Sequence, residues 1–201
     1  AFFGGGAYVA ALLVSHANTP MELAFLLAPI GAGFLAVIIG WLCMRLTGVY
    51  FAMLTLAMAQ LIWSLVYQWG EFTGGDDGLV DIWPAAWLNE TTPYYYFTLI
   101  FGIGGILLLR HVAHSPFGYA LRASRDSARQ AEATGINTKR VQWFAFAFAG
   151  AVAGLAGALF VFSKGSIFPT ELEIARSFDA LIVLFLGGVK TLSGAVVGGA
   201  S

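Results

Sequence analysis

Cysteine and charge are what this sequence has least of. Cys43 is its only cysteine, so the chain has neither a disulfide nor a cysteine-based metal site of its own. Charged residues make up 10% of the 201 residues, whereas a typical soluble domain carries about 25%. Because 59% of the residues are apolar and the mean hydropathy is +0.79, the composition predicts an all-α polytopic membrane protein.

Motifs for chemistry are also missing. The sequence contains no Gly-x-x-x-x-Gly-Lys-Ser/Thr phosphate-binding loop, so we do not expect this chain to hydrolyse ATP. His111 and His114 have a partial metal-ligand spacing, but no third ligand lies near them in the sequence. We therefore predict no metal site, no cofactor and no catalytic residue, and a membrane-embedded enzyme is disfavoured.

One stretch lacks basic residues altogether. Residues 67–93 contain no Lys or Arg but five acids, namely Glu71, Asp76, Asp77, Asp81 and Glu90. Residues 110–140, in contrast, contain six bases and two acids, a net charge of +4. Short loops rich in Lys and Arg stay on the cytoplasmic side of a membrane. We therefore predict that 110–140 is a cytoplasmic loop, that 67–93 is an extracytoplasmic loop, and that the protein spans a bacterial or archaeal plasma membrane.

Long apolar segments separate these loops. A helix that spans a bilayer needs about 20 mainly apolar residues, and five segments approach this: 1–17, 21–44, 48–69, 94–109 and 141–163. A sixth, 178–200, carries Asp179 and Lys190 and is interrupted by two glycines at 187–188, so we expect a broken or re-entrant helix there. The prediction is five to six transmembrane or re-entrant helices in a single membrane domain over residues 1–201, which we expect to be a fragment of a longer chain.

Glycine is abundant, with 25 residues, and several of them recur at a spacing of four: Gly150 with Gly154, Gly157 with Ala153, and Gly194 with Gly198. Such spacing gives a helix a flat strip on which a second helix backbone approaches closely in lipid. Packing within the chain is the simpler interpretation. The alternative is that these strips line a path or slide during a conformational cycle.

The apolar segment 48–69 carries four small or polar groups, at Gly48, Tyr50, Thr55 and Gln60. Polar groups at membrane depth are costly and often functional. We predict that these four residues belong to a translocation path, with helix packing as the alternative for Gln60.

The basic stretch contains a predicted short helix. Ser115 followed by Pro116 is typical of a helix N-terminus, and Gly135 is typical of the residue just beyond a C-terminus. Between them Arg122, Arg125 and Arg129 form a predicted basic ridge. Three interpretations compete for this ridge: contact with anionic lipid headgroups of the bilayer, docking to an acidic groove of a cytoplasmic subunit, and nucleic-acid binding. Three arginines make too small a footprint for nucleic acid, so we expect no such partner.

Longer stretches resemble a known family. The run Ala131-Glu132-Ala133-Thr134-Gly135-Ile136-Asn137, together with 115–123, is similar to the cytoplasmic loop of ABC-transporter permeases of the branched-chain amino acid family. Further stretches resemble its M-type, or second, permease subunit: 48–57, 73–79, 147–159 and 184–189. The sequence departs from the family at Lys190-Thr191, and it is truncated at both ends relative to the family pattern.

The resemblance implies a subunit of an importer. Its partners would be a second permease subunit, two cytoplasmic ATP-binding subunits and an extracytoplasmic substrate-binding protein. The implied ATPase-docking residues are Arg122, Arg125, Arg129, Glu132, Ala133 and Gly135, and we expect Glu132 to be a buried carboxylate that accepts from a donor on the partner. On the opposite side we expect Gly74, Gly75, Asp76 and Asp77 to face the binding protein.

The substrate implied by the resemblance is a branched-chain or related apolar amino acid. Urea, short amides and aromatic acids are alternatives, because related permeases share the same loop motifs. A function of a different class, that of a structural membrane subunit without transport, would not require the helix and turn of the basic loop.

Overall fold

The computed structural model describes residues 1–17, 19–46, 48–83 and 91–188. Its helices are α1 (Phe2–Ala17), α2 (Met21–Cys43), α3 (Val49–Gln68), α4 (Gly70–Thr73), α5 (Thr91–Ala113), α6 (Pro116–Asp126), α7 (Ala128–Ala133), α8 (Thr138–Lys164) and α9 (Ile174–Gly187), with 3-10 turns η1 (Gly75–Asp77) and η3 (Pro169–Leu172). Two short strands, β1 (Leu79–Val80) and β2 (Ser166–Ile167), pair antiparallel with Leu79 opposite Ile167. The prediction of an all-α polytopic membrane protein is confirmed.

The core of the molecule is the packing of α1, α2 and α8. Gly154 of α8 meets α1 at Gly6, where an added Cβ would lie 2.3 Å from the Cα of Gly154. On its other side, a Cβ added at Gly154 would lie 2.2 Å from the Cβ of Ala32 on α2. Gly150 and Ala36 meet in the same way at 2.3 Å. The small-residue strip of α8 therefore packs helices within the chain, as the simpler interpretation predicted.

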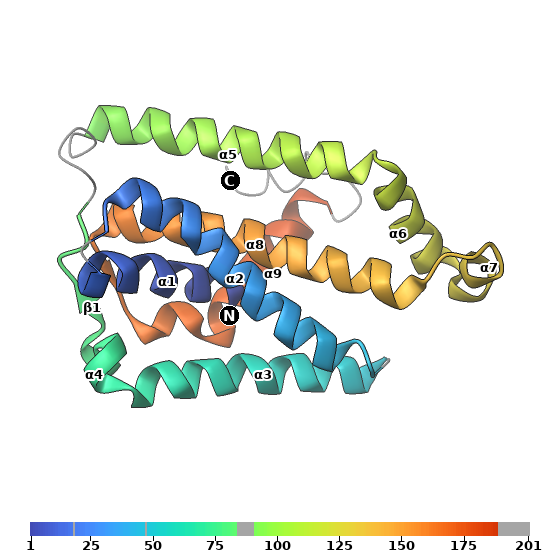
Figure 1. The fold of residues 1–201 in the computed structure, drawn as a ribbon, viewed down its shortest axis with the longest axis horizontal. Helices are drawn as coiled ribbons and strands as arrows, with labels where there is room; N and C mark the ends of the chain where they lie inside the picture. The colour runs from blue at the N-terminus through green and yellow to red at the C-terminus, as the bar shows by residue number, and fades with distance from the viewer. Residues whose placement is uncertain (18, 47, 84–90, 189–201) are drawn as a thin grey trace.

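Helices α3 and α5 lie along this core on opposite sides of it (Figure 1). Each of these two helices contains an 18-residue stretch that is apolar enough to span a bilayer. None of the residues in either stretch, all of which the structure describes, is buried. The corresponding stretches of α2 and α8 are 39% and 33% buried. Exposed apolar side chains on α3 and α5 are what a bilayer or a further membrane subunit would cover.

Four helices of the described chain are long and apolar enough to cross a membrane: α2, α3, α5 and α8. Their bounds match the predicted segments closely except at α5, which extends beyond the predicted 94–109 at both ends. Helix α1, with 16 residues, is a shorter apolar helix. Helix α9 begins at Ile174, before the predicted start, and ends at Gly187. The predictions that rest on Glu90, Lys190 and the Gly194–Gly198 pair lie outside the described residues.

The two polar stretches lie at opposite ends of the elongated molecule (Figure 1). At one end, which we call the acidic end, are α4, η1, β1 and the start of α5. At the other, which we call the basic end, are α6, α7, the start of α8 and the α2–α3 turn with Arg45. The charge reversal in the sequence is therefore a reversal in space.

Candidate functional site

The basic-end loop, residues 114–137, holds α6 and α7 between α5 and α8. Ser115 caps α6, and its hydroxyl oxygen accepts a hydrogen bond from the amide of Gly118 at 3.4 Å. Gly118 is buried, and a Cβ there would lie 2.3 Å from the carbonyl oxygen of Ala113. Arg122 donates to that same carbonyl at 3.2 Å. Helix α6 is thus folded tightly against the end of α5, as glycine at position 118 permits.

The prediction of one continuous helix up to Gly135 is wrong. Helix α6 ends at Asp126, Ser127 is extended (φ −156°, ψ 99°), and α7 begins at Ala128. Serine tolerates such a break, because its side chain competes for backbone hydrogen bonds inside a helix. The change of direction buries Ala131, which is 4% exposed.

This break divides the predicted basic ridge. Arg122 and Arg125 lie on α6, whereas Arg129 lies on α7. Arg122 caps the C-terminus of α5, and Arg125 pairs with Asp126 at 3.1 Å in an exposed ion pair. Within the described part of the chain, Arg129 has no hydrogen bond or ion pair. The guanidinium of Arg129 is therefore the most available of the three for a partner or a lipid headgroup.

Gly135 ends α7, as predicted, in a complete Schellman arrangement. Its φ is +87°, its amide donates to the carbonyl of Glu132 at 3.0 Å, and the amide of Ile136 donates to that of Ala131 at 3.1 Å. The side chain of Asn137 then caps α8 by accepting from the amide of Arg140 at 3.1 Å. Caps on both sides fix the turn between α7 and α8, so α7 is held in one orientation relative to α8.

Glu132 is exposed on the surface of this chain, and its burial against a partner stays a prediction. Exposure has a plain cause, because α7 has only six residues and packs through Ala131 alone. One oxygen of the Glu132 carboxylate accepts a hydrogen bond from the hydroxyl of Thr138 at 2.7 Å. Thr138 is 4% exposed, so it holds the carboxylate in place while the second oxygen can accept a further donor.

A shallow cavity of about 370 Å³ lies at this turn, lined by Glu132, Gly135, Ile136, Asn137 and Lys139. Ala133, the remaining residue predicted to dock a partner, is exposed on α7. The structure thus brings Glu132, Ala133 and Gly135 together on one short turn, with a positioned carboxylate beside a concave surface.

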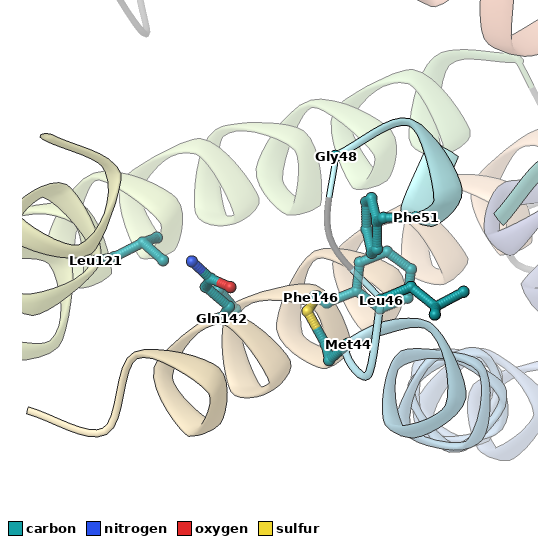
Figure 2. Close-up of a pocket in the computed structure, with 8 residues that line it drawn as sticks. Met44, Leu46, Gly48, Phe51, Leu121, Gln142 and Phe146 are labelled. Atoms are coloured by element: carbon teal, nitrogen blue, oxygen red, sulfur yellow. The ribbon is translucent and has the colours of Figure 1, made fainter. Parts of the chain in front are cut away.

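A second cavity, of about 500 Å³, separates α6 from the α2–α3 turn (Figure 2). Its lining is apolar except for Gln142: Met44, Leu46, Gly48, Phe51, Leu121, Gln142, Ala145 and Phe146. Figure 2 shows the Gln142 amide extending from α8 toward Leu121 of α6, while Phe51 and Phe146 lie beside each other. The cavity is open to the surface on one side, so α6 is not close-packed against the α2–α3 turn here.

The residues predicted to form a translocation path are not brought together. Gly48 lines the cavity beside α6, whereas Tyr50 is 72% exposed. The Thr55 hydroxyl donates to the carbonyl of Ala52 within its own helix. Gln60 is exposed on α3. With about 100° of rotation per residue, Thr55 and Gln60 lie about 140° and 280° around the helix from Tyr50, so the three occupy different faces.

At the acidic end, the glycines at 74 and 75 both have positive φ, +75° and +54°, and place Asp76 and Asp77 on an exposed turn. The pairing of β1 with β2 fastens this turn to the segment that follows α8. Of the four residues predicted for this side, Asp76 and Asp77 are exposed, Gly74 is half-buried and Gly75 is buried beneath the turn.

Sequence reasoning missed an ionic cluster at the same end. Glu171, with a side chain 8% exposed, lies 2.6 Å from the guanidinium of Arg176 and 3.9 Å from the ammonium group of Lys164. The hydrogen bond that the Arg176 guanidinium donates to the Glu171 carboxylate raises the pKa of Arg176. The balanced charges of 164–176 were the available signal, but nothing in their spacing indicates which carboxylate is buried.

The family model described as branched-chain amino acid transport system / permease component matches residues 1–201. The chain is 26% identical to the high-affinity branched-chain amino acid transport system permease protein LivM of Escherichia coli, over 94% of this chain and 51% of the relative. It is 36% identical to the probable branched-chain amino acid transport permease protein LivH of Methanocaldococcus jannaschii, over 51% of this chain and 31% of the relative.

A third relative is the autoinducer 2 import system permease protein LsrC of Yersinia enterocolitica, 30% identical over 84% of this chain and 45% of the relative. No solved structure matches the chain significantly. The chain spans about half the length of the LivM relative. The family model covers every residue, and the family indicated by the sequence motifs is confirmed. This chain is a multi-pass membrane protein that belongs to the branched-chain amino acid transport permease family.

Proposed function

We propose that this chain is part of the transmembrane permease subunit of an ATP-driven importer, and that its substrate is a branched-chain or related apolar amino acid. The observation that carries the proposal is the doubly capped turn at Gly135, which lies between two helices long enough to span the membrane. The family match and the LivM relative support the substrate class.

The basic-end loop is suited to transmit movement. Helix α6 is anchored to the end of α5 through Gly118 and Arg122, and α7 is anchored to α8 through the Thr138–Glu132 hydrogen bond. A cytoplasmic ATP-binding subunit that grips the Glu132–Gly135 turn would therefore move α5 and α8 directly. Helix α8 belongs to the three-helix core, so the displacement would reach α1 and α2.

The charges of the loop fit such a partner. Arg129, Glu132 and the exposed Arg125–Asp126 pair present both signs of charge on a small surface. We assign Arg129 to an acidic group of the ATPase and the free oxygen of Glu132 to a donor there. Arg122 contributes indirectly, because its guanidinium caps α5. Anionic lipid headgroups are the alternative partner of the arginines.

The acidic end then faces the substrate-binding protein, with Asp76 and Asp77 exposed for docking. A second permease subunit would cover the exposed apolar surface of α3, and the bilayer would cover that of α5 on the opposite side of the core. Because Tyr50 and Gln60 are exposed on α3, their place in a translocation path requires that this helix face the other permease subunit.

Reconstituted transport tests the proposal. The complete permease is placed in proteoliposomes together with its proposed partners, namely a second permease, two ATPases and a substrate-binding protein. Uptake of labelled leucine is then followed with and without ATP. We expect ATP-dependent accumulation that valine and isoleucine inhibit. Urea, acetamide, benzoate and autoinducer 2, the last named for the LsrC relatives, complete the panel. Accumulation of one of these four but of no apolar amino acid would contradict the proposed substrate.

A further inference from the structure

A small pocket at the acidic end has not yet been assigned a role. It has a volume of about 150 Å³ and lies between the C-terminal part of α3, η1 and the segment 168–173. Its lining includes Trp63 and Tyr67 from α3, Asp76 from η1, and Phe168 and Glu173 from the opposite segment. Aromatic rings and carboxylates from three separate elements thus converge on one cavity.

Trp63 and Tyr67 form an aromatic wall on one side of the pocket. The rings of Trp63 and Tyr67 stack with their centroids 5.2 Å apart and their planes 19° apart. Indole and phenol rings carry negative charge on their faces and attract a cation placed over them, and tryptophan does so most strongly. A wall of this kind favours a positively charged group that also has apolar surface.

The two carboxylates of the pocket have no partner in the described part of the chain. The side chains of Asp76 and Glu173 make no hydrogen bond and no ion pair there. The nearby cations are engaged elsewhere, since Arg176 and Lys164 both pair with Glu171. The same two cations also lie over the ring of Phe160, at 5.5 Å and 4.6 Å from its centroid.

The volume of the pocket and the negative charge around it further restrict which ligands it can bind. A cavity of about 150 Å³ holds a molecule the size of benzene, so it admits an ammonium group with a short alkyl chain. The neighbouring turn adds Asp77 and Asp81, and a surface of one sign of charge raises the local concentration of counter-ions. Anions are disfavoured, and a neutral amide can donate hydrogen bonds to the unpaired carboxylates but lacks the charge attraction of an ammonium group.

We propose that this pocket binds the ammonium group of an organic ligand, with Asp76 and Glu173 as the anionic partners and Trp63 and Tyr67 as the aromatic wall. Identification of that group as the α-ammonium of the substrate rests on the proposed function. On that basis, the pocket selects amino acids at entry and rejects urea, amides and aromatic acids, which carry no ammonium group.

Four ligands with closely related carbon skeletons test the pocket: leucine, 3-methylbutylamine, 4-methylpentanamide and 4-methylpentanoate. Their binding to the purified permease in nanodiscs is measured by calorimetry. We expect 3-methylbutylamine to bind, leucine to compete with it, and the amide and the carboxylate not to bind. Glu173→Gln and Asp76→Asn should each weaken amine binding about tenfold, the usual magnitude for a hydrogen bond to a charged group.

Asp77→Asn is the matched control, because Asp77 is a neighbouring exposed carboxylate that does not line the pocket. It should change amine binding less than twofold, and thermal unfolding verifies that all three variants fold. Binding of 4-methylpentanoate as tight as that of the amine would overturn the proposal. If Asp77→Asn weakened amine binding as much as Glu173→Gln, the proposal would also be overturned. The amine would then be attracted by the negative charge of the whole surface and not by the carboxylates of the pocket.

Measuring uptake as well as amine binding shows whether the pocket assignment or the proposed substrate is wrong. If leucine uptake persists in the reconstituted importer while 3-methylbutylamine fails to bind, the pocket assignment is wrong and the importer stands. If the amine binds with the expected dependence on Glu173 but no amino acid is transported, the ammonium site stands and the proposed substrate is wrong.

Discussion

Gly154→Ala is the substitution whose effect on stability follows most directly from the structure. The new Cβ would lie 2.2 Å from the Cβ of Ala32, whereas non-bonded carbons are separated by about 3.5–4.0 Å. Helices α8 and α2 must therefore move apart by more than about 1 Å. Overpacking of this kind costs about 1–3 kcal/mol, and the better helix propensity of alanine offsets about 1 kcal/mol of it. We expect a net loss of up to about 2 kcal/mol.

The structure also supplies a rescue and a control. Ala32→Gly removes the methyl group that Gly154→Ala would strike, so the double variant should recover most of the lost stability, with a coupling of at least about 1 kcal/mol in the double-mutant cycle. Gly102 of α5 has no described atom within 4 Å of an added Cβ, and Gly102→Ala should not destabilise the protein. The measurement is thermal unfolding of the purified protein in one detergent. Equal stability of Gly154→Ala, Gly102→Ala and the wild type would refute the packing described for the core.

Three further predictions concern topology, the ionic cluster and the membrane helices. A cysteine at Asp77 should react with an impermeant thiol reagent from outside the cell, with little background from Cys43, which is 0% exposed; labelling only from the cytoplasm would reverse the assigned orientation. Glu171→Gln should lower stability by about 1–2 kcal/mol, measured by thermal unfolding, because the half-exposed Arg176 loses its buried partner; an unchanged unfolding temperature would make the cluster irrelevant to stability. Gln60→Leu should change the KM for uptake more than the amount of assembled transporter, and unchanged kinetics would assign Gln60 to packing.

The membrane helices could be predicted because a long run of apolar residues is enough to identify each of them. Runs of apolar residues predicted α2 and α3 to within one residue at each end. Helix α5 was predicted too short, because Arg110 and His111 appeared to end the apolar run although they continue the helix to Ala113. Backbone hydrogen bonding in a helix continues through a charged residue that reaches the interface, so hydropathy underestimates helix length there.

Contacts between distant segments were not predictable. The pairing of β1 with β2, the burial of Glu171 and the acidic-end pocket all depend on how residues 63–80 meet residues 164–176. Local patterns predicted the caps at Ser115 and Gly135, because capping depends on neighbouring residues alone. The break at Ser127 was missed because it depends on how Ala131 packs.

Gly135→Val tests whether the basic-end loop couples the permease to the ATPases. At φ +87° a residue with a Cβ is strained by about 1–2 kcal/mol, and no described atom lies within 4 Å of the new Cβ, so the damage is confined to the turn. In the reconstituted importer, ATP-driven uptake and substrate-stimulated ATP hydrolysis should fall together, while Gly102→Val, in an open part of α5, retains both. Wild-type uptake and hydrolysis by Gly135→Val, with the ATPases still bound, would contradict the account.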